Sequence, residues 1–482
     1  MPSSFHPRPL TIPSPPSAPQ YAFPDASEIL FSCYPHPVTS VLHLPQLPTP
    51  QRKPIWASDE RIPYTLTTHI VPAAYWREEP DTGLPQAPSR SDDLTKEERM
   101  KLVRITEQKL RQLRQEANEE KAKLNGKIGA GRHQEVLWLC LNRYVRMSPV
   151  EGGHTLFFAH ANGFHKESWE PTLVSLLSSP QSQSQIREIW VWDAVNHGDS
   201  AILNQGKFDS LFHWRNAVLD LLSFLLYYIP DPAHLTTEPF PTHVPRLPVK
   251  ETARRLQEGL LEGIIGVGHS FGGCVCTLSA ISHPTLFHSL ILIDPAIFYP
   301  NPDALQHPKT LAVGALARRG VWKDRDTARQ GFLKSPFFQA WDPRVLDLYV
   351  ETALCDDIDV SADTVVRLKT PPIQEANTFI NSSTGSAEAW VRLWRGELQE
   401  RVPLRWIVPG EGQKELVDTT PTSDGVTATQ VRVWLRPSNS SNVRMAGAGH
   451  LMPQERPMKL GVELQQTLLR LVDGAQENVA KL

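Results

Sequence analysis

The chain has 482 residues, of which 40% are apolar and 21% are charged, as in ordinary globular proteins. This length is large for one domain and short for two full enzymes, so we expect one large domain with insertions or a long extension. The formal net charge of -3 is spread without long runs of one sign, which argues against a nucleic-acid surface. The five cysteines are odd in number and lack metal-ligand spacing, which indicates a reducing compartment.

The amino-terminal part of the chain reads as an extension followed by an accessory segment. Prolines interrupt residues 1–60 every few positions, so we expect this stretch to be extended or poorly ordered. Residues 61–135 are expected to hold one strand at 64–71 and one long helix at 94–124. An apolar stripe at heptad spacing on this helix favours docking on the body of the protein over pairing with another chain. The members of the stripe are Val103, Leu110, Ala117 and Leu124.

From about residue 136, short apolar runs alternate with helical patterns. Runs without polar alternation are typical of strands covered on both faces, so the fold class is α/β with a mostly parallel central sheet. We assign 136–296 and 397–475 to this core, and 297–396, whose patterns are mostly helical, to a helical cap insertion over the carboxyl ends of the strands. The main candidate strands are 135–141, 155–159, 189–192, 264–267, 290–293, 404–408 and 442–445.

A glycine-flanked serine follows the candidate strand at 264–267. Residues 268–272 read Gly-His-Ser-Phe-Gly, which fits the G-x-S-x-G nucleophile elbow and lies directly between a strand and a helix. The glycines are required because side chains beside so sharp a turn would clash with neighbouring strands. Ser270 is therefore the predicted nucleophile, placed where the backbone NH of Phe271 can stabilise an oxyanion.

The matching base is expected on the loop after the last strand. Among the 17 histidines, His450 combines this chain order with a loop of small residues, Ala-Gly-Ala-Gly-His-Leu-Met-Pro at 446–453. Small residues let the imidazole lie over the elbow and act as general base and then as general acid. The alternative is an ordinary surface-loop histidine.

Together, the elbow, the His450 loop and two further segments resemble the α/β-hydrolase superfamily over roughly residues 136–475. The further segments are Phe-Ala-His-Ala-Asn-Gly-Phe-His-Lys-Glu-Ser-Trp at 158–169 and Asp-Ala-Val-Asn-His-Gly-Asp-Ser at 193–200. The His-Ala-Asn-Gly-Phe loop within the first segment, the extra amino-terminal segment and the carboxyl-terminal tripeptide are similar to a fungal peroxisomal branch of this superfamily. That branch includes a yeast peroxisomal lipase, hydrolases of toxin pathways and the acyl-CoA hydrolase of mycophenolic acid biosynthesis. The resemblance implies ester or thioester hydrolysis of an acyl-CoA or lipid-like substrate, with no metal or organic cofactor.

The acid of the expected triad does not occupy the position that is usual in this superfamily. Most members place it in a Gly-x-x-Asp turn after the strand that precedes the histidine's strand, and here Gln413 stands at that aspartate. Glu411 and Asp418 lie nearby and stay open as alternatives. Asp294 ends the strand after the elbow, an edge from which a carboxylate can reach the same imidazole. The resemblance to the mycophenolate-pathway enzyme supports Asp294, whose role would be to orient the imidazole and stabilise the imidazolium.

The second oxyanion donor has two possible positions. If Asn-Gly-Phe aligns with the His-Gly-x turn of the family, the donor is the backbone NH of Phe164. If His160 is the anchor, the donor is the NH of Asn162. His165 and His197 lie on loops at the same edge, and for both we expect a role in loop packing rather than in chemistry.

The carboxyl end adds an expectation about location. The chain closes on Ala480, Lys481 and Leu482, a variant of the Ser-Lys-Leu peroxisomal address, within a tail at 476–482. We therefore expect import into the peroxisomal matrix through the receptor that reads this tripeptide, with the cytoplasm as the alternative. The most apolar run, at 219–229, is too short to span a bilayer, so no transmembrane segment is expected.

These features predict a serine hydrolase, and two other functions stay open. An acyltransferase would share the acyl-enzyme, with an alcohol or amine in place of water. A binding protein that has lost the chemistry would follow if Asp294 were unable to reach His450. Four aromatic residues of the insertion would either form an apolar lid or simply pack the cap. They are Phe332, Phe337, Phe338 and Trp341.

Overall fold

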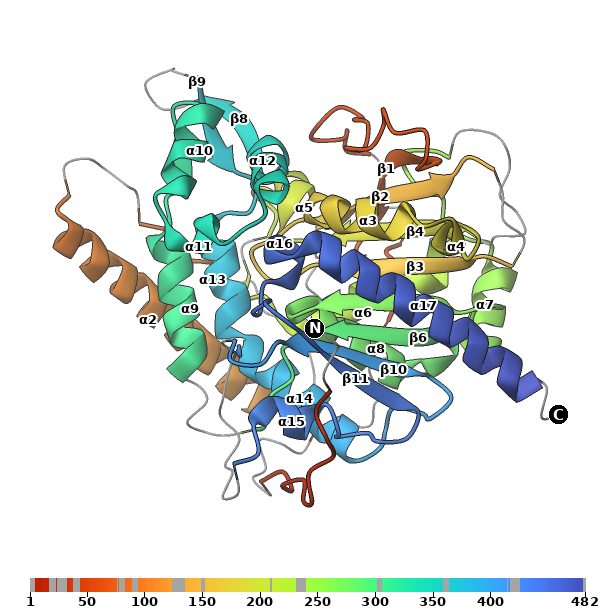
Figure 1. The fold of residues 1–482 in the computed structure, drawn as a ribbon. Helices are drawn as coiled ribbons and strands as arrows, with labels where there is room; N and C mark the ends of the chain where they lie inside the picture. The colour runs from red at the N-terminus through yellow and green to blue at the C-terminus, as the bar shows by residue number, and fades with distance from the viewer. Residues whose placement is uncertain are drawn as a thin grey trace.

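An eight-stranded sheet forms the centre of the protein in the computed structural model (Figure 1). The model describes residues 5–479 except 17–22, 24–32, 38–43, 76, 78–82, 89–93, 124–134, 149–151, 209, 231–239, 301–305, 359–363, 414 and 417–424. The strand order is β1-β2-β4-β3-β5-β6-β10-β11, with β1, β2 and β4 paired antiparallel and all later neighbours parallel. The strands are β1 (Tyr64–Pro72), β2 (Trp138–Arg146), β3 (His154–Ala159), β4 (Ile186–Asp193), β5 (Ile264–His269), β6 (Phe287–Ile293), β10 (Leu404–Pro409) and β11 (Ser440–Met445). The predicted α/β class with a mostly parallel sheet is confirmed.

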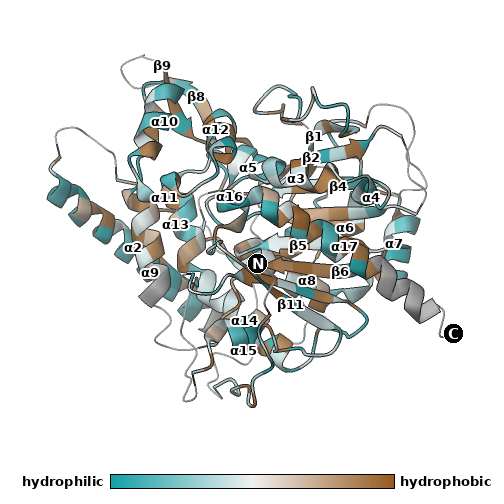
Figure 2. Cartoon of the chain, viewed as in Figure 1, coloured by the Kyte–Doolittle hydropathy of each residue, from teal (hydrophilic) through white to brown (hydrophobic). Residues whose placement is uncertain are grey.

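Helices cover both faces of this sheet because its strands are apolar on both sides. Phe157, Trp190 and Trp192 point to one face, and Phe158 and Val191 point to the other. The central strands are accordingly brown along most of their length (Figure 2). One face packs against α6 (Trp214–Tyr227), α8 (Phe271–Ser282) and α14 (Ser382–Trp394), with α7 (Val249–Glu258) beside α6; the other packs against α3 (Glu170–Leu177) and α17 (Pro457–Val479), with α4 (Pro180–Gln183) beside them. Short elements complete the core: η3 (Lys166–Trp169), α5 (Gly198–Leu203), η5 (Pro284–Leu286), α15 (Ala428–Arg432) and α16 (Met452–Glu455).

The segment between β6 and β10 forms a mostly helical insertion at the carboxyl edge of the sheet (Figure 1). Its helices are α9 (Gln306–Ala317), α10 (Arg325–Leu333), α11 (Pro336–Gln339), α12 (Pro343–Thr352), α13 (Pro372–Ile380) and α14. A three-stranded antiparallel sheet within it was not predicted, and its order is β7 (Val321–Trp322), β9 (Thr364–Leu368), β8 (Leu354–Ile358). The last helix, α14, packs on α6 and α8, so it covers the body rather than the cap.

The accessory helix α2 (Lys96–Lys123) lies against the insertion. Val103 and Leu110 of its apolar stripe are fully buried in a cluster with α9 and α13, and Ala117 is also buried. Leu124 lies outside the described residues. The stripe therefore docks on the same chain.

The described parts of residues 1–60 are mostly irregular, with turns at 55–58, and bind the body through specific polar contacts. Gln51 pairs through its amide with the backbone of Thr68, which covers the open edge of β1. Arg52 forms an ion pair with the buried Glu170, and the backbone NH of His6 donates to Asn442. Within the described part of the chain, no helix has the length and apolar character needed to cross a membrane.

Candidate active site

Ser270 lies at the turn between β5 and α8 with left-handed backbone angles, φ 52° and ψ -114°. Such angles are strained for a residue with a side chain and cluster at functional sites. A Cβ on Gly268 would lie 2.5 Å from the Gly272 oxygen, and one on Gly272 would lie 2.3 Å from the Ala159 oxygen. Both glycines are therefore required by close backbone approach, as the sequence motif predicts.

Three side chains form a continuous relay at this turn. His450 Nε2 lies 3.1 Å from Ser270 Oγ, and His450 Nδ1 lies 2.7 Å from Asp294 Oδ2. The three residues come from the ends of β5, β6 and β11, which meet at the carboxyl edge of the sheet. The structure thus brings together the serine, histidine and aspartate that the sequence singles out.

Asp294 is fully buried and is fixed at the edge of the sheet. Its backbone NH donates to the oxygen of Ile407 at 2.8 Å, and its φ of 35° is left-handed. Burial alone would raise the pKa of Asp294, but the Arg432 guanidinium and the hydrogen bond with His450 lower it to about 2. The carboxylate therefore stays ionised and can stabilise a protonated His450.

The usual acid position does not supply a comparable group. Glu411 is exposed over 83% of its side chain and lies 3.9 Å from Arg444 in a long ion pair. Gln413 donates its backbone NH to Gly410 in the turn, and its side chain cannot replace a carboxylate in charge. Asp418 lies outside the described residues.

Two polar contacts hold the loop that carries His450. The ring of His269 donates from Nε2 to the carbonyl oxygen of His450 at 2.8 Å. Burial and the nearby His450 lower the pKa of His269 to about 3, so its ring is neutral. The backbone NH of Gly449 donates to Glu455 of α16 at 2.9 Å. The candidate base is therefore held through contacts on its own backbone and on that of its neighbour Gly449.

Of the two positions expected for the second oxyanion donor, the structure favours Asn162 over Phe164. The NH of Phe271 is at the amino terminus of α8, as expected. The NH of Phe164 instead donates to the Ala161 oxygen at 3.1 Å within a turn, and the NH of Gly163 donates to His197 Nε2 at the same distance. Within the described part of the chain, the NH of Asn162 has no acceptor. The geometry therefore disfavours Phe164 and favours the other alternative, Asn162.

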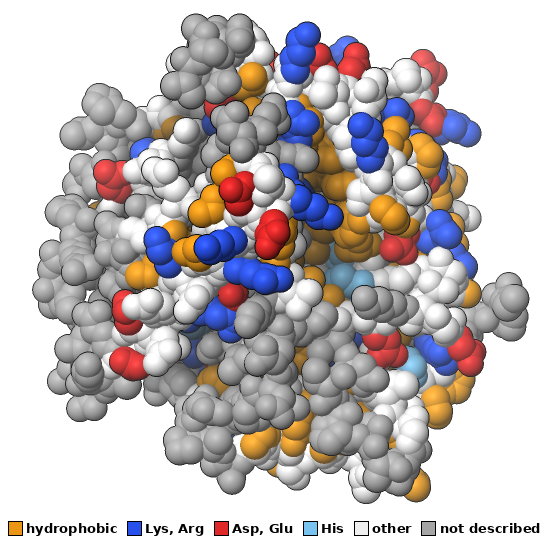
Figure 3. Space-filling model, turned by 90° about the vertical axis from the view of Figure 1, so that its left-hand side faces the viewer, with side chains coloured by type: hydrophobic (Ala, Val, Ile, Leu, Met, Phe, Trp, Pro, Cys, Tyr) orange, Lys and Arg blue, Asp and Glu red, His pale blue; other side chains and the backbone are white. Residues whose placement is uncertain are grey.

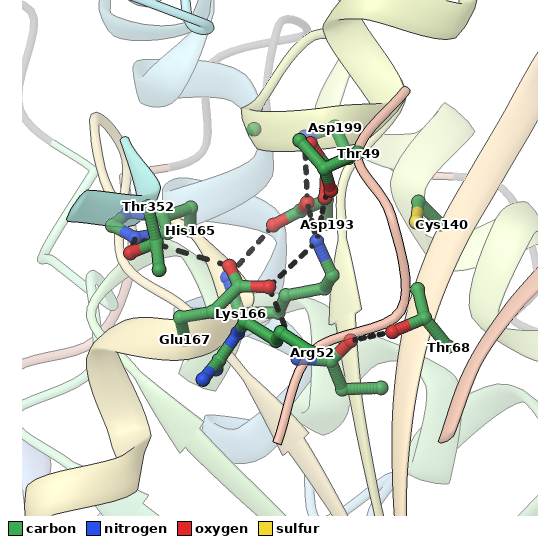
Figure 4. Close-up of polar contacts among 12 residues, drawn as sticks. Thr49, Arg52, Thr68, Cys140, His165, Lys166, Glu167, Asp193, Asp199 and Thr352 are labelled. Atoms are coloured by element: carbon green, nitrogen blue, oxygen red, sulfur yellow. Dashed lines mark hydrogen bonds and ion pairs between the residues drawn. The ribbon is translucent and has the colours of Figure 1, made fainter. Parts of the chain in front are cut away.

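A buried cluster of charges supports the loop that carries these donors (Figure 4). Lys166 Nζ lies 2.9 Å from Glu167, 3.0 Å from Asp193 and 2.5 Å from Asp199. Lys369, which precedes α13 in the insertion, lies 2.7 Å from Asp199. Because buried charges require compensating partners, this cluster fixes the loop after β3 to β4, α5 and the insertion.

His165 and His197 take supporting positions on the same loops. His165 Nε2 is hydrogen bonded with Thr352 of α12 at 2.7 Å, and His197 Nε2 lies 2.9 Å from Asn162 Oδ1. Burial lowers the pKa of His165 to about 3 and lowers that of His197 as well, so both rings are neutral. Their contacts fit the predicted role in loop packing.

The relay opens into a cavity of about 1270 Å³ between the core and the insertion. In Figure 3 the face that carries α2 and the insertion is hollowed, with hydrophobic side chains in the wall, histidine inside and Lys and Arg along one side. Ser382, Ser383 and Thr384 make another part of the lining polar, and Asn118 of α2 contributes as well. Aromatic residues of the insertion line the cavity and also pack against one another. The expectations of an apolar lining and of packing within the cap therefore both hold for this group. The group consists of Trp322, Phe332, Phe337, Phe338, Trp341 and Tyr349.

Comparison with known proteins agrees with this fold. The model of the "Alpha/beta hydrolase family" matches residues 156–463. The chain belongs to the alpha/beta hydrolase family. This hydrolase is 27% identical over 381 residues to the type I acyl-CoA thioesterase mpaH of Penicillium brevicompactum, covering 66% of this chain and 78% of the relative. It is 25% identical over 449 residues to mpaH of Penicillium roqueforti, covering 81% and 84%.

A yeast protein resembles this hydrolase in both sequence and structure. A "peroxisomal membrane protein" of Saccharomyces cerevisiae is 30% identical over 167 residues, covering 32% of this chain and 37% of the relative. The solved structure of a peroxisomal alpha-beta-hydrolase from Saccharomyces cerevisiae superimposes with a TM-score of 0.53 at 16% identity, covering 84% and 90% of the two chains. The structural likeness supports the fold.

Sequence reasoning missed Arg432, which contacts the candidate acid directly. Arg432 lies 138 residues after Asp294, in a short helix that follows an undescribed stretch. No local motif marks this arginine, and only its pairing with Asp294 in space reveals it. The charge cluster around Lys166 was missed for the same reason.

Proposed function

We propose that this alpha/beta hydrolase is a serine hydrolase that cleaves an ester or thioester through an acyl-enzyme. The observation that carries the proposal is the relay from Ser270 through His450 to Asp294, which lies at the base of a large cavity. A nucleophile within reach of a base, with that base oriented by a buried carboxylate, is the arrangement that activates a serine hydroxyl.

The chemistry follows from these contacts. As Ser270 Oγ attacks the acyl carbon, His450 Nε2 takes the hydroxyl proton, and the NH groups of Phe271 and Asn162 bind the oxyanion. The carbon–oxygen or carbon–sulfur bond then breaks, and His450 returns the proton to the leaving alcohol or thiol. Water attacks the acyl-enzyme by the same proton transfers, which releases the carboxylic acid and restores Ser270.

The cavity lining favours an acyl-CoA as the substrate. Its aromatic wall suits an apolar acyl group. Arg319 and Lys334 also line the cavity, and neither has an acidic partner among the described residues. Unpaired cations beside an apolar pocket suit a substrate that carries phosphate groups. Two relatives are named acyl-CoA thioesterases, and an acyl-CoA combines an apolar acyl group with phosphate groups, which adds support.

The geometry supports the hydrolase over the alternative of a degenerate binding protein. That alternative required an aspartate unable to reach the imidazole, but Asp294 Oδ2 lies 2.7 Å from His450 Nδ1. Water is the proposed acceptor of the acyl group, because two relatives are named thioesterases. No observation on the described residues favours an alcohol or amine as the acceptor instead.

A fluorophosphonate probe tests the nucleophile. We expect covalent labelling of the full chain, and complete loss of labelling in Ser270→Ala, because the probe reacts with activated serines. Ser282→Ala is a matched control, since Ser282 is buried at the end of α8, the helix that follows Ser270, and donates to the backbone oxygen of Leu278. A folded wild-type protein that is not labelled would overturn the proposal.

A substrate comparison tests the leaving group. We expect faster hydrolysis of a long-chain acyl-CoA than of the same acyl group on N-acetylcysteamine, because only the CoA ester carries phosphates for Arg319 and Lys334. Added salt should reduce this preference by screening the charges. If both thioesters were hydrolysed at equal rates at all salt concentrations, the proposed contacts of Arg319 and Lys334 with the CoA phosphates would be refuted, while the hydrolase activity would stand.

We also propose a peroxisomal location, which the peroxisomal yeast relative supports. The tripeptide Ala480, Lys481 and Leu482 lies outside the described residues. A fluorescent protein fused to the amino terminus should colocalise with a peroxisomal marker and become cytosolic when these three residues are deleted. Unchanged import after the deletion would show that another signal directs the protein.

A further inference from the structure

The two carboxylate oxygens of Asp294 face two different partners. Oδ2 faces His450 Nδ1 at 2.7 Å, and Oδ1 accepts a hydrogen bond from a guanidinium nitrogen of Arg432. Both carboxylate and guanidinium are removed from water, with exposed side-chain fractions of 0% and 5%. The acid of the relay is therefore also half of a buried ion pair.

Arg432 is itself held in one orientation by contacts that do not involve the triad. One terminal nitrogen donates to the carbonyl oxygen of Pro295 at 2.7 Å, and the other donates to Thr429 Oγ1 at 3.2 Å as well as to Asp294. The guanidinium carbon lies 6.0 Å from the centre of the Phe298 ring. A planar guanidinium fixed in this way imposes one orientation on the carboxylate that it binds.

Arg432 lies on a chain connection that is important in this superfamily. Arg432 closes α15, which lies on the connection between β10 and β11. This is the connection that holds the catalytic acid in most members of the superfamily. Here it supplies a cation that faces an acid carried by β6.

We propose that Arg432 is a positioning residue that fixes the orientation and charge of the Asp294 carboxylate toward His450. This inference rests on the proposed serine hydrolase function. The β10–β11 connection thus keeps a part in the relay, but as the partner of the acid and not as its source.

The charged and titratable groups facing Asp294 show why the cation is needed. They are Arg432 from α15, His450 from the loop after β11, and His269 from β5. His269 is neutral at working pH because burial lowers its pKa to about 3. Without Arg432, the only remaining cation facing Asp294 among the described residues would be His450 when it is protonated, while burial would continue to raise the pKa of Asp294. A protonated or rotated Asp294 would not hold the imidazole in its productive tautomer.

Three variants of the full chain test this role through the rate of fluorophosphonate labelling between pH 5 and pH 9. Arg432→Gln removes the charge, and Arg432→Lys keeps the charge but loses the planar fork. Arg436→Gln is the matched control, because Arg436 is a buried arginine of the same connection that donates to the backbone oxygens of Gln399, Val402 and Asn439. Melting temperatures are measured for all three.

In Arg432→Gln we expect labelling at the pH optimum to fall by about 10- to 100-fold, the loss typical of a misplaced catalytic group. The acid limb of its pH profile should move to higher pH, because the guanidinium that lowers the pKa of Asp294 is gone while burial still raises that pKa. Arg432→Lys should keep the wild-type acid limb and be slower than wild type. Arg436→Gln should lower the melting temperature and leave the acid limb in place.

A folded Arg432→Gln protein with the wild-type rate and acid limb would overturn the inference. An equal shift of the limb in Arg436→Gln would do the same, since the effect would then be structural. If Arg432→Gln does not fold, Arg432→Lys decides: slowed labelling supports the inference, and the wild-type rate at every pH overturns it.

A second measurement separates this inference from the proposed function. The proton on His450 Nδ1 should give a low-field NMR resonance, which Asp294→Asn identifies by its loss. We expect this resonance to change in chemical shift and to broaden in Arg432→Gln, because the carboxylate that accepts the Nδ1 proton is then less firmly held, whether or not the protein hydrolyses any substrate. An unlabelled wild type would refute the hydrolase, and an unchanged resonance in Arg432→Gln would refute the role of Arg432.

Discussion

Two neighbouring strands end in carboxylates at the same edge of the sheet, and only one of them reaches the histidine. Asp294, after β6, is fully buried, hydrogen bonded to His450 and paired with Arg432. Glu411, after β10, is mostly exposed and has one distant partner, Arg444. Water competes for an exposed carboxylate and weakens its ion pairs, whereas a buried one interacts strongly but needs a compensating cation. The difference favours Asp294 on β6 as the candidate acid, because Arg432 compensates its buried charge.

The largest expected effect comes from removing the charge of Asp294, and the same change at Glu411 and Asp418 serves as the control. We expect Asp294→Asn to lower kcat by about 10³- to 10⁴-fold, because the imidazole loses the group that sets its tautomer and stabilises its charge. Glu411→Gln should change kcat by less than about threefold, because this side chain is exposed. We expect the same of Asp418→Asn, because Asp294 already faces His450. The rates are measured on the best substrate of the panel, with circular dichroism to verify folding. Inactivation by either control substitution would return the acid to the usual strand.

The pH dependence of stability sharpens the same comparison. The pKa of Asp294 is lowered from 3.8 to about 2, so its ionised form stabilises the fold above pH 4. This contribution is lost as the pH falls from 4 to 2, and a shift of this size corresponds to about 2 kcal/mol. The difference in unfolding free energy between wild type and Asp294→Asn should therefore shrink by that amount over this range, as measured by urea unfolding. A constant difference would mean that Asp294 titrates alike in the folded and unfolded chains.

The smallest effect is expected at the exposed pair. Arg444→Gln removes the only cation that the structure places near Glu411 among the described residues. Because exposed ion pairs contribute little, the unfolding free energy should change by less than about 1 kcal/mol, and kcat should stay at the wild-type value. A large loss of activity would show that the β10 turn contributes more to the site than its exposure indicates.

The parts of the site that local sequence determines were predictable. Gly268 and Gly272 are required by backbone approach at one tight turn, so the motif itself specifies the position of Ser270. The small residues around His450 mark its loop in a similar way. The parallel sheet could be predicted because its buried strands are continuous apolar runs.

Features that depend on contacts between distant segments were not predictable. Phe164 and Asn162 lie two positions apart in one short turn. The choice between them depends on which backbone NH is already bound within the turn, and the NH of Phe164 is bound to Ala161. Arg432 meets Asp294 across 138 residues, and no periodicity links the two. The small sheet of the insertion escaped notice because β8 and β9 have only five residues each and carry charged side chains that mask a strand pattern.

The docking of α2 has a consequence for how substrate reaches the cavity. Val103 and Leu110 are buried against α9 and α13, and residues of both α9 and α13 line the cavity. Swinging α9 outward would expose both side chains, at a cost of about 1.5–3 kcal/mol each. Such an open form would be populated at roughly one molecule in a hundred to one in ten thousand or fewer. Substrate should therefore reach the cavity through a preformed entrance, because the packing of α2 on α9 and α13 stabilises the wall of the cavity.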